Sequence, residues 1–260
     1  MVKIAIVKLS AMGDIVHAMI TLQGIKAQLP DAQIDWIVEE GFSGLLVHNP
    51  DIDHILPVRL KALKQCRSCL FAEVRKIKTY AKNNYDVVID LQGLIKSGVL
   101  ARMLGPAVGF DRHSIREQAA SFFYRKSFHI PYDENVIYRN IQLVDAVLGI
   151  TTSREQIRRK APFLFFDEEE RNKTASFLRR DQKNIIYILG SSWESKIYPR
   201  EKLATVIKAL GENALLVWGS EQEQASALLL ADQCDAIPLP RLTLGGLKAL
   251  ISEAALVIGG

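Results

Sequence analysis

The chain repeatedly alternates short, almost continuously apolar runs with longer segments whose apolar residues recur at helical spacing. The first run, VKIAIVKL, is rich in β-branched residues, and the runs NIIYIL and ALLVW are similar. Runs of this kind, without regular polar alternation, are typical of strands buried on both faces of a parallel sheet. Because helical segments separate them, the sequence predicts an α/β fold with parallel sheets.

One segment, 151–162, interrupts this pattern because it is polar, charged and without periodicity. We therefore expect two domains, 1–150 and 151–260, which suits a chain of 260 residues because domains typically contain about 100–200. The second domain has about four expected strands and ends on Val257-Ile258-Gly259-Gly260, a strand running into a glycine turn. We expect this second domain to be incomplete.

Composition narrows the class of protein. The chain is 48% hydrophobic and 24% charged, as in ordinary globular proteins, and no apolar run approaches the roughly 18 residues of a membrane span. The N-terminus lacks the pattern of a secretory signal, so we expect the protein in the cytoplasm. The net charge of +4 is weak support for an anionic partner.

The first loop, Ser10-Ala11-Met12-Gly13-Asp14, joins the first expected strand to the first expected helix, where open α/β sheets bind ligands. It is neither a P-loop nor a G-x-G-x-x-G fingerprint, which argues against a nicotinamide oxidoreductase. Asp14 has two interpretations that spacing alone leaves open. It caps the helix N-terminus, or it serves as a general base.

Two patterns suggest metal sites without completing one. Asp51-Ile52-Asp53 precedes its strand and follows Asn49-Pro50, so a turn explains it better than a metal site. Cys66 and Cys69 form a single C-x2-C pair, whereas structural zinc needs four ligands. We assign no metal and no cofactor.

A strongly basic segment, 59–83, carries eight cations against the single acid Glu73. We expect one long helix over this segment, from Arg59 to Asn83. A solvated helix face is the simplest explanation, and contact with an anionic sugar or a phosphate-bearing lipid surface is the functional alternative. Nucleic acid is disfavoured, because no aromatic residues interleave at stacking spacing.

The second half contains two polar loops that follow buried strands. Ser191, Ser192 and Lys196 offer hydroxyls and a cation suited to a diphosphate, although a polar surface loop looks similar. Glu221 and Glu223 open the helix after Trp218-Gly219-Ser220, where a carboxylate binds ribose hydroxyls or complements the helix dipole.

Taken together, five segments resemble the lipopolysaccharide core heptosyltransferases of glycosyltransferase family 9, and most closely their heptosyltransferase I branch. The resemblance runs from residue 1 to 260. Its segments are IVKLSAMGDIVHAM (6–19), DWIVEEGF (35–42), DLQGLIKSG (90–98), the stretch from Ile115 to SFFY (121–124), and GSSWESKIYP (190–199).

The resemblance implies a GT-B fold, in which two Rossmann-like domains face each other across a cleft. It implies an N-terminal acceptor-binding domain and a C-terminal nucleotide-sugar-binding domain. Members move L-glycero-D-manno-heptose from ADP-heptose to a 3-deoxy-D-manno-octulosonic acid (Kdo) residue of Kdo-lipid A, with inversion. It also implies a peripheral location on the cytoplasmic face of the inner membrane.

The resemblance further implies roles at individual positions. Asp14 matches the general base. The donor-binding positions are Met12, Gly13, Ser191, Ser192, Lys196, Glu223 and Leu242, and the acceptor-binding positions are Lys61, Lys64, Lys96 and Arg116. The two serines stand where threonines are common, and the leucine stands where an apolar side chain packs on adenine.

Two other interpretations remain open. The chain is a heptosyltransferase of another acceptor specificity, such as one that adds the second core heptose. Alternatively, it is an inactive binding module, because the family's Asp-Thr-Gly donor loop and the histidine after it do not follow Gly260.

Overall fold

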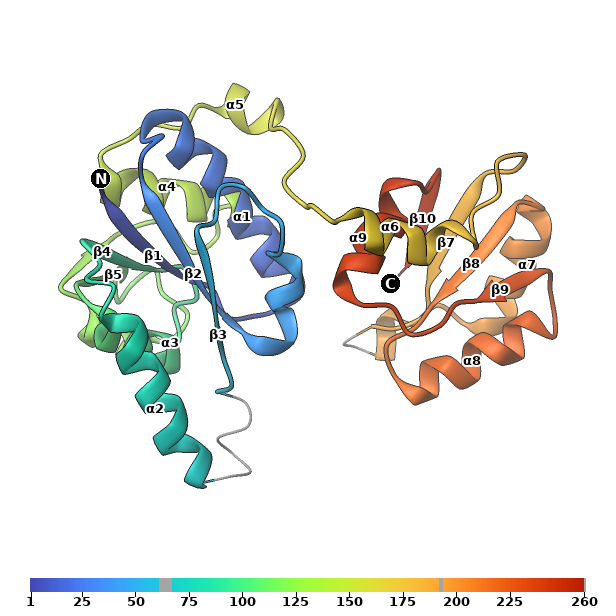
Figure 1. The fold of residues 1–260 in the computed structure, drawn as a ribbon, viewed down its shortest axis with the longest axis horizontal. Helices are drawn as coiled ribbons and strands as arrows, with labels where there is room; N and C mark the ends of the chain where they lie inside the picture. The colour runs from blue at the N-terminus through green and yellow to red at the C-terminus, as the bar shows by residue number, and fades with distance from the viewer. Residues whose placement is uncertain (61–66, 192–193, 260) are drawn as a thin grey trace. The chain divides into compact units, whose positions relative to one another are not determined.

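The computed structural model describes residues 1–60, 67–191 and 194–259, which form two compact units, Met1–Leu164 and Phe165–Gly260. Each unit contains one parallel sheet with helices on it (Figure 1). The α/β fold with parallel sheets is therefore confirmed.

The sheet of the first unit has six strands in the order β3-β2-β1-β4-β5-β6, and every neighbouring pair is parallel. The strands are β1 (Lys3–Val7), β2 (Gln33–Glu39), β3 (His54–Val58), β4 (Val87–Asp90), β5 (Ala107–Phe110) and β6 (Lys126–Phe128). The helical elements are α1 (Met12–Gln28), η1 (Glu40–Leu45), α2 (Arg67–Ala81), α3 (Ile95–Leu104), η3 (Gln118–Phe123), α4 (Val136–Leu148) and α5 (Arg154–Arg158).

Helices cover both faces of this sheet, which explains why β1 is apolar from Ile4 to Val7. On one face, Ala5, Val7 and Leu9 pack with Ile77 of α2 and Leu100 of α3. On the other face α1 and α4 contact each other (Figure 1). Burial on both faces is the arrangement that a continuous apolar run predicts.

The sheet of the second unit has the order β10-β7-β8-β9 and is also parallel. Its strands are β7 (Asn184–Ile188), β8 (Asn213–Val217), β9 (Ala236–Pro238) and β10 (Leu256–Gly259). Its helical elements are α6 (Glu168–Ala175), η4 (Glu194–Lys196), α7 (Arg200–Leu210), α8 (Glu221–Ala231) and α9 (Leu244–Ser252). Apolar side chains pack against both faces of this sheet as well.

The first unit extends past Ile150 to Leu164, although the sequence analysis assigned 151–164 to the second domain. Side chains of the first unit hold this segment. Gln28 donates to the carbonyl of Thr151, Gln23 to that of Ala161, and Asn49 to that of Phe163, at 2.9–3.0 Å. A segment without periodicity offers no sequence signal for such contacts.

Candidate functional site

The first unit carries its candidate site where the order of the strands reverses. The chain runs outward from β1 to β2 and β3, and then returns to place β4 on the other side of β1. In open α/β sheets, ligands bind at this switch point, outside the carboxyl ends of the strands. Two loops lie there, Lys8–Ala11 after β1 and 91–94 after β4.

Gln92 ties the two loops together. Its side-chain oxygen Oε1 accepts hydrogen bonds from the backbone N–H groups of Leu9 and Ser10, each at 3.0 Å. Those residues lead directly into the N-terminus of α1, which carries Asp14. The Gln92 side chain thus helps to fix the loop that presents the candidate base.

Asp90, the last residue of β4, fixes the loop 91–94 that follows it. Its fully buried carboxylate accepts from the hydroxyls of Ser97 and Tyr124 at 2.8 Å, and from the N–H groups of Gln92 and Gly93 at 2.8 and 3.2 Å. Burial raises the pKa of Asp90, and these hydrogen bonds oppose that shift. Gly93 has φ +68°, a conformation that favours glycine.

A cavity of about 140 Å³ opens at this switch point, lined by Lys8, Asp14, Gln92, Arg116, Arg139 and Asn140 among others. It brings together two residues that the sequence analysis singled out, Asp14 and Arg116. Asp14 also accepts a 3.3 Å hydrogen bond from the N–H of Ala11, so its carboxylate caps α1 and lines the cavity at the same time.

Lys8 gives the cavity a buried cation. The side chain is only 5% exposed, and its Nζ donates to the carbonyl of Leu91 at 2.8 Å. Burial lowers the pKa of Lys8, while the nearby charges of Asp14 and Asp90 oppose that shift. The ammonium group therefore lies in the electrostatic field of both carboxylates.

Arg139, on the first turns of α4, is held by aromatic rings. Its guanidinium carbon lies 4.5 Å from the centroid of the Phe110 ring and 4.7 Å from that of Tyr132. Its Nη2 donates to the carbonyl of Ser114 at 2.5 Å. Burial lowers the pKa of Arg139 from its ordinary value. Stacking and this hydrogen bond fix the orientation of the planar group.

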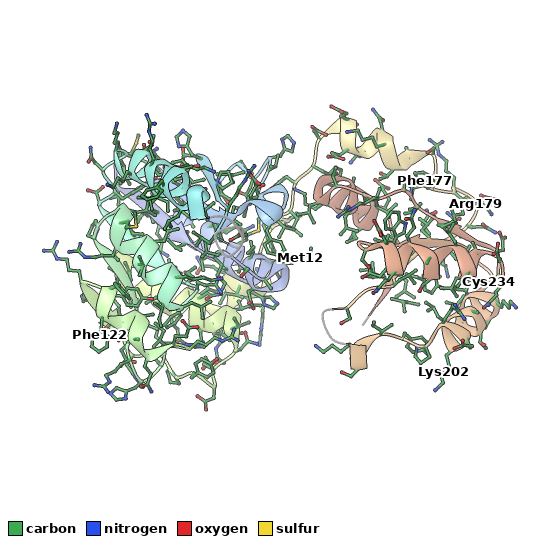
Figure 2. The ribbon with its side chains drawn as sticks, turned by 90° about the horizontal axis from the view of Figure 1, so that it is seen from below. Met12, Phe122, Phe177, Arg179, Lys202 and Cys234 are labelled. Carbon is green, nitrogen blue, oxygen red and sulfur yellow. The ribbon has the colours of Figure 1, made fainter. Side chains whose placement is uncertain are left out.

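Other expected site residues of the first unit lie outside this cavity. Met12 and Gly13 begin α1 and are exposed, and Figure 2 labels Met12 at that helix. Lys96 lies exposed on the first turn of α3. Lys61 and Lys64 lie outside the described residues.

The second unit has its own polar group at the end of β7. Gly190 and Ser191 follow this strand, at the switch point between β7 and β10. The Glu223 carboxylate accepts from the N–H of Gly219 at 2.7 Å and lies so close to Gly190 that a Cβ there would collide with it. Glu223, rather than Glu221, is therefore the carboxylate that reaches this loop.

The other donor-binding candidates are more dispersed. Lys196 is exposed at the end of η4. Leu242 is half-buried against the core and lines a separate cavity of about 280 Å³ with Glu170, Phe177 and Thr243. Ser192 lies outside the described residues.

Sequence reasoning missed Lys8, Gln92, Arg139 and Asn140. Lys8 did give a signal, since it lies between Val7 and Leu9 in an apolar run, and a lysine is expensive to bury without a partner. Asn140 gave one too, because it lies on the buried face of α4 beside Ile141. Gln92 and Arg139 gave none, because their contacts come from segments distant in sequence.

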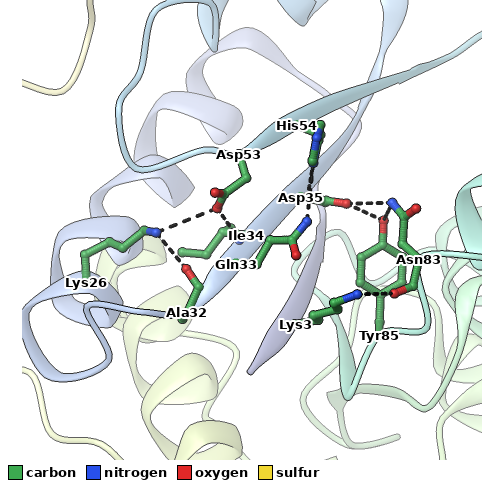
Figure 3. A network of polar contacts seen from close by, with 10 residues as sticks. All are labelled: Lys3, Lys26, Ala32, Gln33, Ile34, Asp35, Asp53, His54, Asn83 and Tyr85. Atoms are coloured by element: carbon green, nitrogen blue, oxygen red, sulfur yellow. Dashed lines mark hydrogen bonds and ion pairs between the residues drawn. The ribbon is translucent and has the colours of Figure 1, made fainter. Parts of the chain in front are cut away.

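Both aspartates of the D-x-D pattern have structural partners, and Figure 3 shows those of Asp53. The Asp53 carboxylate accepts from the N–H of Ile34 at 2.7 Å and pairs with Lys26 at 3.7 Å. The N–H of Asp51 donates to Asn49 within the turn. Across residues 1–60, 67–191 and 194–259, no group of three or more His, Cys, Asp or Glu is placed to hold a metal.

No helix in the described part of the chain combines the length and the apolar character needed to cross a membrane.

Comparison with known proteins identifies the family. Residues 74–260 match Glycosyltransferase family 9 (heptosyltransferase). Lipopolysaccharide heptosyltransferase 1 of Campylobacter coli is 34% identical over 99% of this chain and 78% of its own length. The enzyme of the same name from Escherichia coli K12 is 28% identical over 98% of this chain and 81% of its own length.

Solved structures agree with this result. E. coli heptosyltransferase WaaC with ADP-2-deoxy-2-fluoro heptose superposes with a TM-score of 0.82 at 26% identity, covering 98% of this chain and 81% of that chain. A second structure of WaaC, with ADP, also superposes with a TM-score of 0.82. The chain therefore belongs to glycosyltransferase family 9, the heptosyltransferases, and is a heptosyltransferase I-like glycosyltransferase of lipopolysaccharide core synthesis.

Proposed function

We propose that this protein transfers L-glycero-D-manno-heptose from ADP-heptose to the Kdo residue of Kdo-lipid A, with inversion at the anomeric carbon. The observation that carries the proposal is the cavity of the first unit. It combines one half-buried carboxylate, Asp14, with the cations Lys8, Arg116 and Arg139. This set suits a nucleophilic hydroxyl on a sugar acid, since it offers a base for the hydroxyl and cations for the acid.

In the proposed reaction, an acceptor hydroxyl oxygen attacks the anomeric carbon of the donor as the bond to the ADP oxygen breaks. The hydroxyl proton passes to the Asp14 carboxylate, and ADP leaves with the electron pair of the broken bond. A general base within hydrogen-bond reach of the nucleophile typically contributes about 10²- to 10⁴-fold to the rate. Attack from the face opposite the leaving group inverts the configuration.

The donor is proposed to bind the second unit. The relatives crystallised with ADP and with ADP-2-deoxy-2-fluoro heptose support an ADP-sugar donor. Ser191, Ser192 and Lys196 are proposed to bind the diphosphate, with Met12 and Gly13 beside it. Glu223 is proposed to bind the ribose and Leu242 to pack on adenine. Cationic donors stabilise a departing diphosphate without requiring a metal.

The acceptor is proposed to bind the first unit. Arg116 lines the cavity beside Asp14, while Lys61, Lys64 and Lys96 are proposed to meet the rest of the anionic acceptor. Three cations of α2, Arg75, Lys76 and Lys78, support a peripheral position on the cytoplasmic face of the inner membrane. Polybasic segments are drawn to anionic lipid by about 1 kcal/mol per cation near the surface.

An acceptor panel tests this function. The protein is incubated with ADP-heptose and either Kdo-lipid A or heptosyl-Kdo-lipid A, and products are measured by mass and by NMR of the anomeric centre. We expect one added heptose on Kdo-lipid A, with inverted configuration. Transfer only to the heptosylated acceptor would instead assign the second core heptose, and no transfer to either would favour a binding module.

A further inference from the structure

Two residues that line the cavity beside Asp14 each carry a buried nitrogen donor. Neither donor has a hydrogen-bond acceptor in the described part of the chain. These are Nε of Arg139 and Nδ2 of Asn140. Buried donors are almost always hydrogen-bonded, because leaving one unpaired costs about 1–3 kcal/mol. Two such donors on consecutive residues that line one cavity point to a ligand with acceptor atoms.

The charges around the cavity indicate what this ligand is. Its lining contains three cations, Lys8, Arg116 and Arg139, and one carboxylate, Asp14. Positive charge is therefore in excess, and an anionic group on the ligand would offset it. A planar guanidinium matches a carboxylate well, because its N–H groups lie in one plane and present a fork.

The surroundings of Arg139 prepare it for this role. The rings of Phe110 and Tyr132 and the Ser114 carbonyl fix the guanidinium, so little side-chain entropy is lost when a ligand binds. Asn140 is 2% exposed on the adjacent position of α4, so its amide is also held in place.

We propose that Arg139 and Asn140 bind the carboxylate of the acceptor sugar acid, and so make the first unit selective for an acidic sugar over a neutral one. The proposal rests on the proposed function, since it assigns the acceptor to this cavity. Arg139 contributes Nε–H and Asn140 contributes Nδ2–H to the carboxylate oxygens.

A binding experiment without donor tests the proposal. The probes are Kdo-lipid A freed of its acyl chains, and the same compound with the Kdo carboxyl converted to a carboxamide. Dissociation constants are measured by calorimetry. We expect the unaltered protein to prefer the carboxylate by about 10- to 100-fold, the range for hydrogen bonds to charged groups.

Two substitutions test whether Arg139 and Asn140 cause the preference for the carboxylate. Arg139→Lys keeps the positive charge but removes the Nε donor and the planar fork, and should reduce the preference to about threefold or less. Asn140→Asp keeps the shape but replaces a donor by a carboxylate, and should reverse the preference. Arg154→Lys is the matched control, because Arg154 also stacks on a tyrosine, Tyr138 at 5.3 Å, but does not line the cavity.

Each outcome decides the proposal. It is overturned if the unaltered protein binds both probes equally, or if Arg139→Lys weakens both by the same factor. A thermal melt of each variant separates misfolding from loss of recognition. Transfer is assayed separately. A preference for the carboxylate without any transfer would refute the proposed function alone. Transfer together with an unchanged carboxylate preference in both variants would refute this inference alone.

Discussion

At the residue scale, the site consists of charged groups whose burial and partners differ sharply. Asp14 and Arg116 were predicted from the sequence, because one follows the first strand and the other belongs to the family resemblance. Lys8 was not predicted, although its place in an apolar run was a signal, and Arg139 was not predicted because its importance depends on which loops meet at the switch point. The spacing of residues along the chain does not indicate which loops lie together in the folded protein.

Arg116→Ala should raise the KM for the acceptor about tenfold and leave the KM for ADP-heptose within twofold. An arginine–anion contact of this exposed kind is worth about 1.4 kcal/mol, which corresponds to a factor of ten. Initial rates at varied acceptor and varied donor measure both constants. Arg112→Ala is the control, because Arg112 is exposed near Arg116 but does not line the cavity. Equal changes in both constants would remove Arg116 from the acceptor site.

Lys8→Met should change how stability depends on pH. Burial lowers the pKa of Lys8 below its ordinary 10.5, so the unfolded chain binds more protons than the folded one between the lowered pKa and 10.5. The unaltered protein therefore gains stability over Lys8→Met as pH rises through that window. Urea unfolding of both proteins between pH 7 and 10 measures the difference. A difference that falls with pH would contradict this account.

At the element scale, most strands and long helices follow from apolar periodicity, and the irregular elements do not. The short 3-10 helices η1 (Glu40–Leu45) and η3 (Gln118–Phe123) are examples of such irregular elements. The strand β6, KSF, was missed because three exposed or half-buried residues carry no alternation signal. Short elements of this kind are set by tertiary contacts, which outweigh local preference.

A buried polar network at the amino ends of the strands of the first sheet provides a stability test away from the site. Asp35 of β2 is fully buried and accepts from the Tyr85 hydroxyl at 2.7 Å, the Asn83 amide at 2.9 Å and, through its other oxygen, pairs with His54 of β3 at 2.9 Å (Figure 3). Burial and the bond to Asp35 raise the pKa of Tyr85 well above its usual range.

Tyr85→Phe should lower the free energy of unfolding by about 1–2 kcal/mol, because a buried carboxylate loses one donor while the ring still fills its space. Transfer activity should not change, since this network lies at the amino ends of the strands and the candidate site lies at their carboxyl ends. Urea unfolding and the transfer assay measure the two quantities. A loss of transfer activity without a loss of stability would contradict this prediction, because it would mean that the network at the amino ends affects the site at the carboxyl ends.

At the scale of the whole molecule, the central proposal is that the two units bind different substrates. The parallel α/β fold was predictable because runs such as Ile4–Val7 and Ile185–Ile188 are continuously apolar. The end of the first unit was not, because 151–164 is held by side-chain bonds from Gln23, Gln28 and Asn49. Each unit carries polar loops at its own switch point, and we propose that the first serves the acceptor and the second the donor.

The most direct test of this account compares Asp14→Asn with the unaltered protein in transfer and in ADP binding. The amide keeps the shape of the side chain and cannot accept the acceptor proton, so transfer should fall by about 10²-fold or more. The dissociation constant for ADP, measured by calorimetry, should stay within twofold, because Asp14 is not among the proposed nucleotide contacts. Near-full turnover of Asp14→Asn would contradict the assignment of Asp14 as the base.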